Sequence, residues 1–194
     1  MKKRIIVAAT GASGSPLLIQ CLKLIKADGR FETGLIMSKG ARLTLKHETD
    51  KTAEEIEALA DRVYGFTEIG EGPASGSFRT EGMLIVPCSM KTLAGIHGGY
   101  ADNLILRAAD VTLKEQRTLV LAARETPLSA VHLRNMYELS VVPGVRIIPP
   151  MLTYYIRPGS VEEMTYHSAA KLVEPFGVET PEYRRWEGIQ SVRF

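Results

Sequence analysis

Two short motifs in this chain place glycines and hydroxyl side chains where an anion could bind. The first covers residues 11–14 (GASG) and is followed by Pro16, a residue suited to the first turn of a helix. The second covers residues 87–92 (PCSMKT), in which Ser89 and Thr92 supply hydroxyls. Backbone N–H groups and the dipole at a helix N-terminus favour negative charge. Both motifs therefore predict phosphate-binding turns; the alternatives are an ordinary strand–helix turn for the first and a simple N-cap for Ser89.

Charged residues in two further motifs could hold a second anion and move a proton. Arg124 and Glu125 directly follow an apolar run at 118–123. An arginine can bind a phosphate through two parallel hydrogen bonds, and a glutamate can donate or accept a proton; the alternative is a structural salt bridge between the two. The other motif, residues 107–115, includes Lys114. We expect both motifs to present charges on the same side of a sheet, so that an anionic cofactor and an anionic substrate meet in one pocket.

Residue spacing disfavours several other chemistries. The glycines lack the GxGxxG spacing of dinucleotide-binding proteins, and neither Ser13 nor Ser89 sits in the GxSxG turn of a hydrolase. Cys88 follows an apolar strand, which favours a buried hydrophobic role over a nucleophilic one. The histidines have no metal-ligand spacing, so we predict no metal site. They are His47, His97, His132 and His167.

The elements that must position these motifs alternate between strand and helix. Apolar runs predict strands at 4–9, 33–37, 83–86, 118–123 and 145–148. Helical spacing predicts helices at 17–27, 39–46, 53–60, 90–96, 103–116, 129–139 and 161–173, with Thr52 and Ser160 as N-caps. Continuous apolar strands separated by helices indicate an α/β protein with a parallel sheet and helices on both faces. Such sheets bind ligands at the carboxyl ends of their strands, where Ser89 and Arg124 lie.

The composition is typical of one globular domain covering residues 1–194. The chain is 45% hydrophobic and 24% charged, and its net charge of +2 comes from interleaved basic and acidic residues, which disfavours nucleic acid as a partner. No apolar stretch is long enough to span a membrane, and Gly11 and Gly14 interrupt the first one too early for a signal peptide. Two cysteines make no disulfide framework, so we expect a location in the reducing cytoplasm. Residues 68–80 should form a mobile surface loop, and the tail at 179–194 should pack on neighbouring subunits.

Taken together, the motifs resemble those of the UbiX-type flavin prenyltransferases, which were formerly described as aromatic acid or 3-octaprenyl-4-hydroxybenzoate decarboxylase B subunits. Each motif is weak alone, but their order along one chain is highly specific. The resemblance is carried by residues 10–14, 37–39, 47–50, 75–78, 87–94, 107–115, 124–128, 132–136, 149–150, 155–158 and 185–186.

The resemblance implies a three-layer Rossmann-like or flavodoxin-like flavoprotein, assembled as a homododecamer with active sites between subunits. It implies that a dimethylallyl group passes from dimethylallyl monophosphate to N5 and C6 of reduced FMN, without a metal. The product, prenylated FMN, is the cofactor of UbiD-type decarboxylases. Such a decarboxylase could serve ubiquinone biosynthesis or the decarboxylation of aromatic acids.

The resemblance also assigns residues to the site. Glu125 would relay a proton to and from the leaving phosphate, while Ser13 and Glu48 would lie by the flavin and assist later steps. Lys114 and Tyr155 are implied to take part in catalysis as well. The FMN-binding set is Gly11, Ala12, Ser13, Ser38, Ser89, Met90, Lys91, Thr92 and Arg124. The substrate phosphate would contact Lys114, Arg124, Tyr155 and Lys171, some of them from neighbouring subunits.

The chain departs from the family pattern at two places. Lys171 stands where the family usually has an arginine, which keeps the charge but loses the planar fork that can bind a phosphate through two bonds. The turn at 141–144 is one residue longer than usual, which leaves Tyr154 as an alternative to Tyr155; the spacing to Pro158 favours Tyr155.

Two other functions fit part of the pattern. A flavoprotein of the cysteine-decarboxylase type would use oxidised FMN, but it would need an asparagine-containing motif at 87–91 and would give Lys114 no role. An FMN-binding carrier or accessory subunit of an aromatic acid decarboxylase would bind the flavin without changing it. Substitution of Glu125 by Gln should leave a carrier unaffected, whereas a transferase should lose turnover with FMN still bound.

Overall fold

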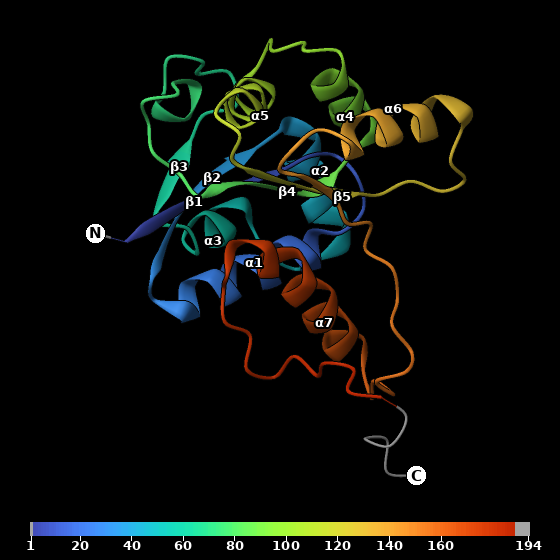
Figure 1. Ribbon diagram of the computed structural model, residues 1–194. Helices are drawn as coiled ribbons and strands as arrows, with labels where there is room; N and C mark the ends of the chain where they lie inside the picture. The colour runs from blue at the N-terminus through green and yellow to red at the C-terminus, as the bar shows by residue number, and fades with distance from the viewer. Residues whose placement is uncertain (1, 189–194) are drawn as a thin grey trace.

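Six parallel strands form the centre of the molecule (Figure 1). The structure is a computed structural model, and it describes residues 2–188. The strands are β1 (Lys3–Ala9), β2 (Phe31–Met37), β3 (Arg62–Tyr64), β4 (Gly82–Cys88), β5 (Thr118–Ala123) and β6 (Val145–Ile147). Their order across the sheet is β3-β2-β1-β4-β5-β6, and Ile5 of β1 lies opposite Thr33 of β2 and Gly82 of β4.

Helices cover both faces of this sheet (Figure 1). They are α1 (Ser15–Asp28), α2 (Lys39–Glu48), α3 (Ala53–Glu57), α4 (Met90–His97), α5 (Leu104–Lys114), α6 (Ala130–Ser140) and α7 (Val161–Val173). One buried cluster joins α1, α2, α3 and α7 to the sheet and includes Leu22, Leu45 and Leu172. The other joins α4, α5 and α6 and includes Leu93 and Ile105. None of the helices within residues 2–188 is long and apolar enough to cross a membrane.

The predicted α/β architecture is confirmed, and several elements agree closely with the sequence pattern. β5 and α7 begin and end at the residues that the apolar spacing predicted. Thr52 and Ser160 cap their helices as expected. The Thr52 hydroxyl accepts a hydrogen bond from the Glu55 amide, and the Ser160 hydroxyl accepts one from the Glu163 amide.

Two predictions about elements were wrong. The strand β3 was missed, because its three residues at the edge of the sheet are too few to show a period, and only Tyr64 among them is buried. The helix α3 ends at Glu57 rather than at residue 60. The amides of Leu59 and Ala60 bond to carbonyls three residues earlier, which tightens the chain into a turn.

Three arginines bond to the Gly- and Ser-rich loop at 68–80, and two of them hold its middle part. Arg107 Nε donates to the Ala74 carbonyl at 3.2 Å. Arg117 donates to the carbonyls of Gly76 at 2.7 Å and Phe78 at 2.9 Å. The expected loop is therefore present, but three of its carbonyls are bound by side chains from α5 and from the turn before β5.

The described part of the C-terminal tail lies along α7 of its own chain (Figure 1). Arg184 pairs with Glu163, and the ring of Trp186 packs edge-on against Tyr155 with 5.3 Å between the ring centres. The predicted packing of residues 179–194 on neighbouring subunits includes residues 189–194, which lie outside the described residues.

Candidate active site

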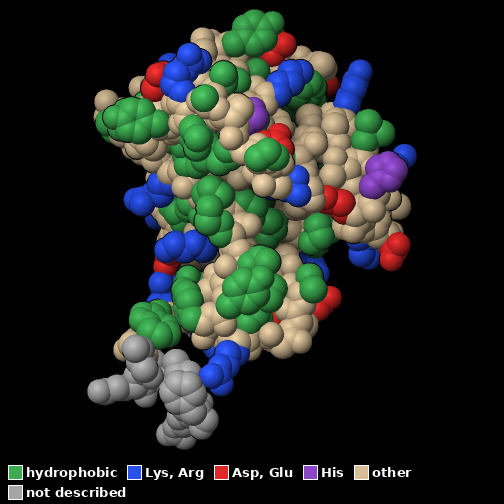
Figure 2. Space-filling model, turned by 90° about the vertical axis from the view of Figure 1, so that its right-hand side faces the viewer, with side chains coloured by type: hydrophobic (Ala, Val, Ile, Leu, Met, Phe, Trp, Pro, Cys, Tyr) green, Lys and Arg blue, Asp and Glu red, His purple; other side chains and the backbone are tan. Residues whose placement is uncertain are grey.

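The turns that follow β1, β2, β4 and β5 are hydrogen-bonded to one another at the carboxyl edge of the sheet. Thr10, which is buried, stands between two of them: its hydroxyl donates to the Pro87 carbonyl at 2.9 Å and accepts from the Ser89 amide at 2.8 Å. The amide of Ser38 bonds to the last residue of β1 and the amide of Arg124 to the last residue of β4, both at 3.0 Å. The motifs predicted at this edge are thus brought together. Figure 2 views the molecule from this side.

Glu48 occupies the anion-binding position that the sequence predicted in the first motif. Its carboxylate accepts hydrogen bonds from the amides of Gly14 at 3.0 Å and Ser15 at 2.7 Å, at the N-terminus of α1. Burial opposes ionisation of Glu48, but bonds from the Ser13 hydroxyl and these two amides outweigh it and lower its pKa. The Gly14 and Ser15 amides of this turn therefore already hold an anion that belongs to the chain itself, and the role of the turn toward an external phosphate stays a prediction.

Gly11 serves close packing between two turns. A Cβ at this position would lie 3.2 Å from Cα of Gly40, and a Cβ at Gly40 would lie 3.1 Å from Cα of Gly11. The start of α2 therefore approaches the turn after β1 more closely than most side-chain contacts do. This contact sets Ser38, which caps α2 through the Ala41 amide at 3.1 Å, beside the first motif.

The second motif keeps unpaired donors. The Ser89 hydroxyl caps α4 by accepting a hydrogen bond from the Thr92 amide at 3.4 Å, so Ser89 is an N-cap residue. The amides of Met90 and Lys91, in the first turn of α4, have no hydrogen-bond partner within residues 2–188. These amides point to an anion site at α4 that no side chain of the described chain fills.

Arg124 stands exposed beside this helix end without an ion pair. None of the salt bridges among residues 2–188 involves its guanidinium, so the alternative of a structural pair with Glu125 is wrong. The Glu125 carboxylate is exposed as well and accepts a hydrogen bond from the Thr126 amide at 3.1 Å. A free guanidinium and free helix amides together fit the phosphate group of a flavin mononucleotide.

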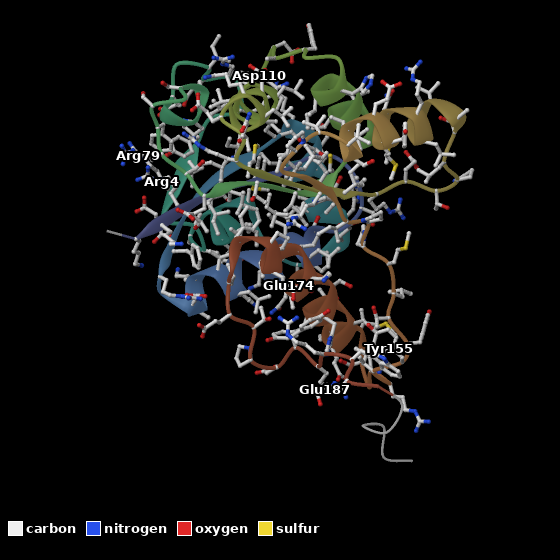
Figure 3. The ribbon with its side chains drawn as sticks, viewed as in Figure 1. Arg4, Arg79, Asp110, Tyr155, Glu174 and Glu187 are labelled. Carbon is white, nitrogen blue, oxygen red and sulfur yellow. The ribbon has the colours of Figure 1, made fainter. Side chains whose placement is uncertain are left out.

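A cavity of about 250 Å³ contains Tyr155 and Lys171. It opens between α7, the tail and the segment that follows β6, and Tyr154 is not part of its lining. Lys171 Nζ lies 2.6 Å from a carboxylate oxygen of Glu174. Figure 3 labels Tyr155 on the segment before α7 and Glu174 just after that helix. The lining also includes His167, Ser168, Tyr183 and Arg184.

Lys114 lies at the opposite edge of the sheet. Its Nζ is 2.6 Å from a carboxylate oxygen of Glu115 and lies next to Gly76. Gly76 belongs to the 68–80 loop, which Arg117 binds from the turn before β5. A helix between two parallel strands runs antiparallel to them, so its C-terminal residue returns to the amino edge. The expectation that the motif at 107–115 and the pair Arg124-Glu125 lie on the same side is therefore wrong within one chain.

The fold and its sequence are shared with known proteins. A family model described as Flavoprotein matches residues 1–173. A "probable UbiX-like flavin prenyltransferase" of Bacillus subtilis (strain 168) is 47% identical over 190 residues, covering 98% of this chain and 92% of that protein. The chain belongs to the family of UbiX-like flavin prenyltransferases. The sequence resemblance is thereby confirmed.

Two solved structures of this family superpose closely on the chain. A dodecameric FMN-dependent UbiX-like decarboxylase from Escherichia coli O157:H7 has a TM-score of 0.93 and 48% identity, and the match covers 95% of this chain and 100% of that one. AnUbiX (PadA1), in complex with FMN and dimethylallyl pyrophosphate, has a TM-score of 0.94 and 47% identity over 97% of this chain and 99% of that one.

Sequence reasoning missed the bonds that Thr10 and Glu48 make within this site, although it named Glu48 as a site residue. Thr10 was treated only as the start of a turn, although a threonine directly after an apolar strand is well placed to bond to a neighbouring turn. The capping bonds of Glu48 were missed because 33 residues or more separate it from its partners. Cys88 is fully buried as predicted, and burial raises the pKa of its thiol to about 12.

Proposed function

We propose that this protein is a flavin prenyltransferase that joins the dimethylallyl group of dimethylallyl monophosphate to N5 and C6 of reduced FMN. One observation carries the proposal: the free guanidinium of Arg124 lies at the sheet edge where the amides of Met90 and Lys91 are also unpaired. The family relationship, at 47% identity, supports it. Reduced FMN supplies the nucleophilic N5 and C6 atoms when it is bound.

The FMN would be held by the connected turns at the carboxyl edge. Arg124 and the first turn of α4 suit its phosphate, because cations and free amides stabilise a dianion. Ser13 lies beside Glu48, and the Glu48 carboxylate orients the Ser13 hydroxyl by accepting a hydrogen bond from it. The full proposed set is Gly11, Ala12, Ser13, Ser38, Ser89, Met90, Lys91, Thr92 and Arg124.

The prenyl phosphate would be held by Lys114, Arg124, Tyr155 and Lys171. Its C–O bond breaks as the prenyl group is transferred, and the phosphate leaves as inorganic phosphate. Without a metal, positive charges and hydrogen bonds must stabilise the leaving group, and three of these four residues are cations. Glu125 is proposed to pass a proton to the leaving phosphate, which makes it a better leaving group.

The active protein is proposed to be a homo-oligomer, and we favour a dodecamer. Lys114 can join Arg124 only if a neighbouring subunit supplies it, because it lies at the other edge of its own sheet. Large apolar side chains are also exposed along the segment that follows the carboxyl edge of β5. They are Leu128, Val131, Leu133, Tyr137, Val141, Met151, Leu152, Tyr154 and Tyr155. The E. coli O157:H7 relative is dodecameric.

We also propose where the product goes and where the protein is located. A UbiD-type decarboxylase is the proposed recipient of prenylated FMN, because the resemblance implies that such decarboxylases use it as their cofactor. The reducing cytoplasm is the proposed location, which suits the two unpaired and buried thiols of Cys21 and Cys88.

The test is anaerobic incubation of the protein with reduced FMN and dimethylallyl monophosphate, followed by mass spectrometry of the extracted flavin. We expect a flavin heavier by one C5 prenyl unit with the wild type. With Glu125→Gln we expect turnover to fall by about a hundredfold or more while FMN still binds. Unmodified FMN with both the mono- and the diphosphate would contradict the proposal and favour the carrier or the cysteine-decarboxylase alternative.

A further inference from the structure

Glu174 bridges two cations beside the cavity that contains Tyr155. One carboxylate oxygen lies 2.6 Å from Lys171 Nζ, and the other accepts a hydrogen bond from the Arg185 guanidinium. The hydrogen bond from Lys171 contributes most to lowering the pKa of Glu174, and the bond to Glu174 raises the pKa of Lys171. All three groups are therefore charged at neutral pH, and together they carry a net charge of +1.

The other groups around this cavity do not change that balance. Arg184, which also lines the cavity, is paired with Glu163. His167 is buried, and burial lowers its pKa, so it is neutral at pH 7. The tail residues Tyr183 and Arg184 line one side of the cavity, whereas Glu174 and Arg185 line a separate hollow and act on the cavity only through Lys171 and at longer range.

We propose that Glu174 is a specificity-determining residue, which limits the positive charge offered to the phosphate chain of the prenyl donor and so favours a monophosphate over a diphosphate. The inference rests on the proposed function. With Glu174 present, Lys171, Glu174 and Arg185 together add one net positive charge to those of Lys114 and Arg124. Without it, Lys171 and Arg185 would both be free. Since Coulomb attraction grows with the product of the charges, the diphosphate would gain more than the monophosphate.

The first experiment compares donors in the prenylation assay with the intact oligomer. For Glu174→Gln we expect the ratio of kcat/KM for dimethylallyl diphosphate to that for the monophosphate to rise by about threefold or more, a size suited to half-exposed ion pairs. For Arg185→Gln we expect the ratio to fall. The double variant, which again has one net positive charge, should return toward the wild-type ratio.

A second readout does not depend on turnover. Titration calorimetry with inorganic phosphate and pyrophosphate should show that Glu174→Gln gains more affinity for pyrophosphate than for phosphate. The matched control is Glu81→Gln, which changes the net charge equally but breaks a pair with Lys3 away from the cavity. The control should leave both ratios unchanged.

The outcomes separate this inference from the proposed function. A wild type that prenylates FMN, together with donor and calorimetric ratios unchanged in Glu174→Gln, would overturn the role of Glu174 and leave the transferase intact. Equal losses with both donors in all three variants would also overturn it, since that is the result of simple damage to the tail. A wild type inactive with both donors would remove the proposed function itself.

Discussion

At the scale of single residues, Glu48 has the most unusual place. Its carboxylate lies at the N-terminus of a helix that follows the first strand, where many nucleotide-binding proteins hold a phosphate. Two amides and the Ser13 hydroxyl bind it, so it stabilises the helix start and orients Ser13 at the same time. The free donors of the site therefore lie at α4, next to Arg124.

The contribution of Glu48 to stability should be visible in a pH series. Its pKa is lower in the folded state than in the unfolded state, so the stabilisation is complete above the ordinary glutamate pKa of about 4.3 and is lost as the pH falls through the lower folded-state pKa. Glu48→Gln should lower the free energy of unfolding at pH 7 by about 1–2 kcal/mol. Urea unfolding at pH 7 and pH 4 measures this, and the difference from wild type should shrink at pH 4. A loss that is the same at both pH values would contradict the role of the charge.

At the scale of elements, one carboxylate connects the end of α1 to the start of the tail. Asp28 accepts hydrogen bonds from Arg30 Nε at 2.5 Å and Nη2 at 2.7 Å, and from the Glu179 amide at 2.7 Å. Its side chain is only 1% exposed. The bonds from Arg30, acting against burial, lower the pKa of Asp28 to about 2. The end of α1, the start of β2 and the start of the tail are thus held together by one ionised group.

Loss of the Asp28 carboxylate should lower the free energy of unfolding only at pH values where this carboxylate is ionised. Since the folded pKa is about 2 and the unfolded one about 3.9, the stabilisation is present above about pH 5 and lost as the pH falls toward 2. Asp28→Asn should lower the free energy of unfolding at pH 7 by about 1–2 kcal/mol, less than the full shift implies because Arg30 is 52% exposed. Guanidinium unfolding between pH 7 and pH 3 tests this. A difference that does not narrow with falling pH would contradict it.

Sequence patterns predicted the central elements well and the contacts between distant residues poorly. β5 and α7 were found because continuous burial or one buried helix face leaves a clear apolar period. β3 was missed because an edge strand of three residues leaves none. The edge on which Lys114 lies follows from chain direction rather than from residue type, so its motif alone could not place it. The capping by Glu48 depends on the fold that brings α2 to α1, and no local signal reports it.

At the scale of the whole molecule, the position of Lys114 has the widest consequence. The carboxyl edge of the sheet carries Arg124 and Glu125, whereas Lys114 lies in the same chain at the amino edge, beside Gly76. A site that needs all three residues must draw on at least two subunits. The exposed apolar side chains from Leu128 to Tyr155 give those subunits a surface to bury.

Mixed oligomers should reveal such a shared site. Lys114→Met and Glu125→Gln should each be inactive alone. Oligomers assembled from both chains should regain about a quarter of wild-type activity, because random mixing places an intact Lys114 and an intact Glu125 in that share of sites. The flavin prenylation assay on co-expressed chains measures this, with separately purified and freshly mixed oligomers as the control. Activity that stays at the level of the single variants would show that both residues act from one chain.

The Glu48 carboxylate at the start of α1 affects how stable the protein is after it releases its product. If prenylated FMN is a product to be handed on, each catalytic cycle ends with an empty protein. A protein whose first turn relied on the flavin phosphate for order would loosen at that moment. Here Glu48 already satisfies the Gly14 and Ser15 amides, so the turn after β1 keeps its bonds whether or not flavin is present. Because Glu48 takes the place of a bound anion at this turn, the flavin can leave without disordering the start of α1.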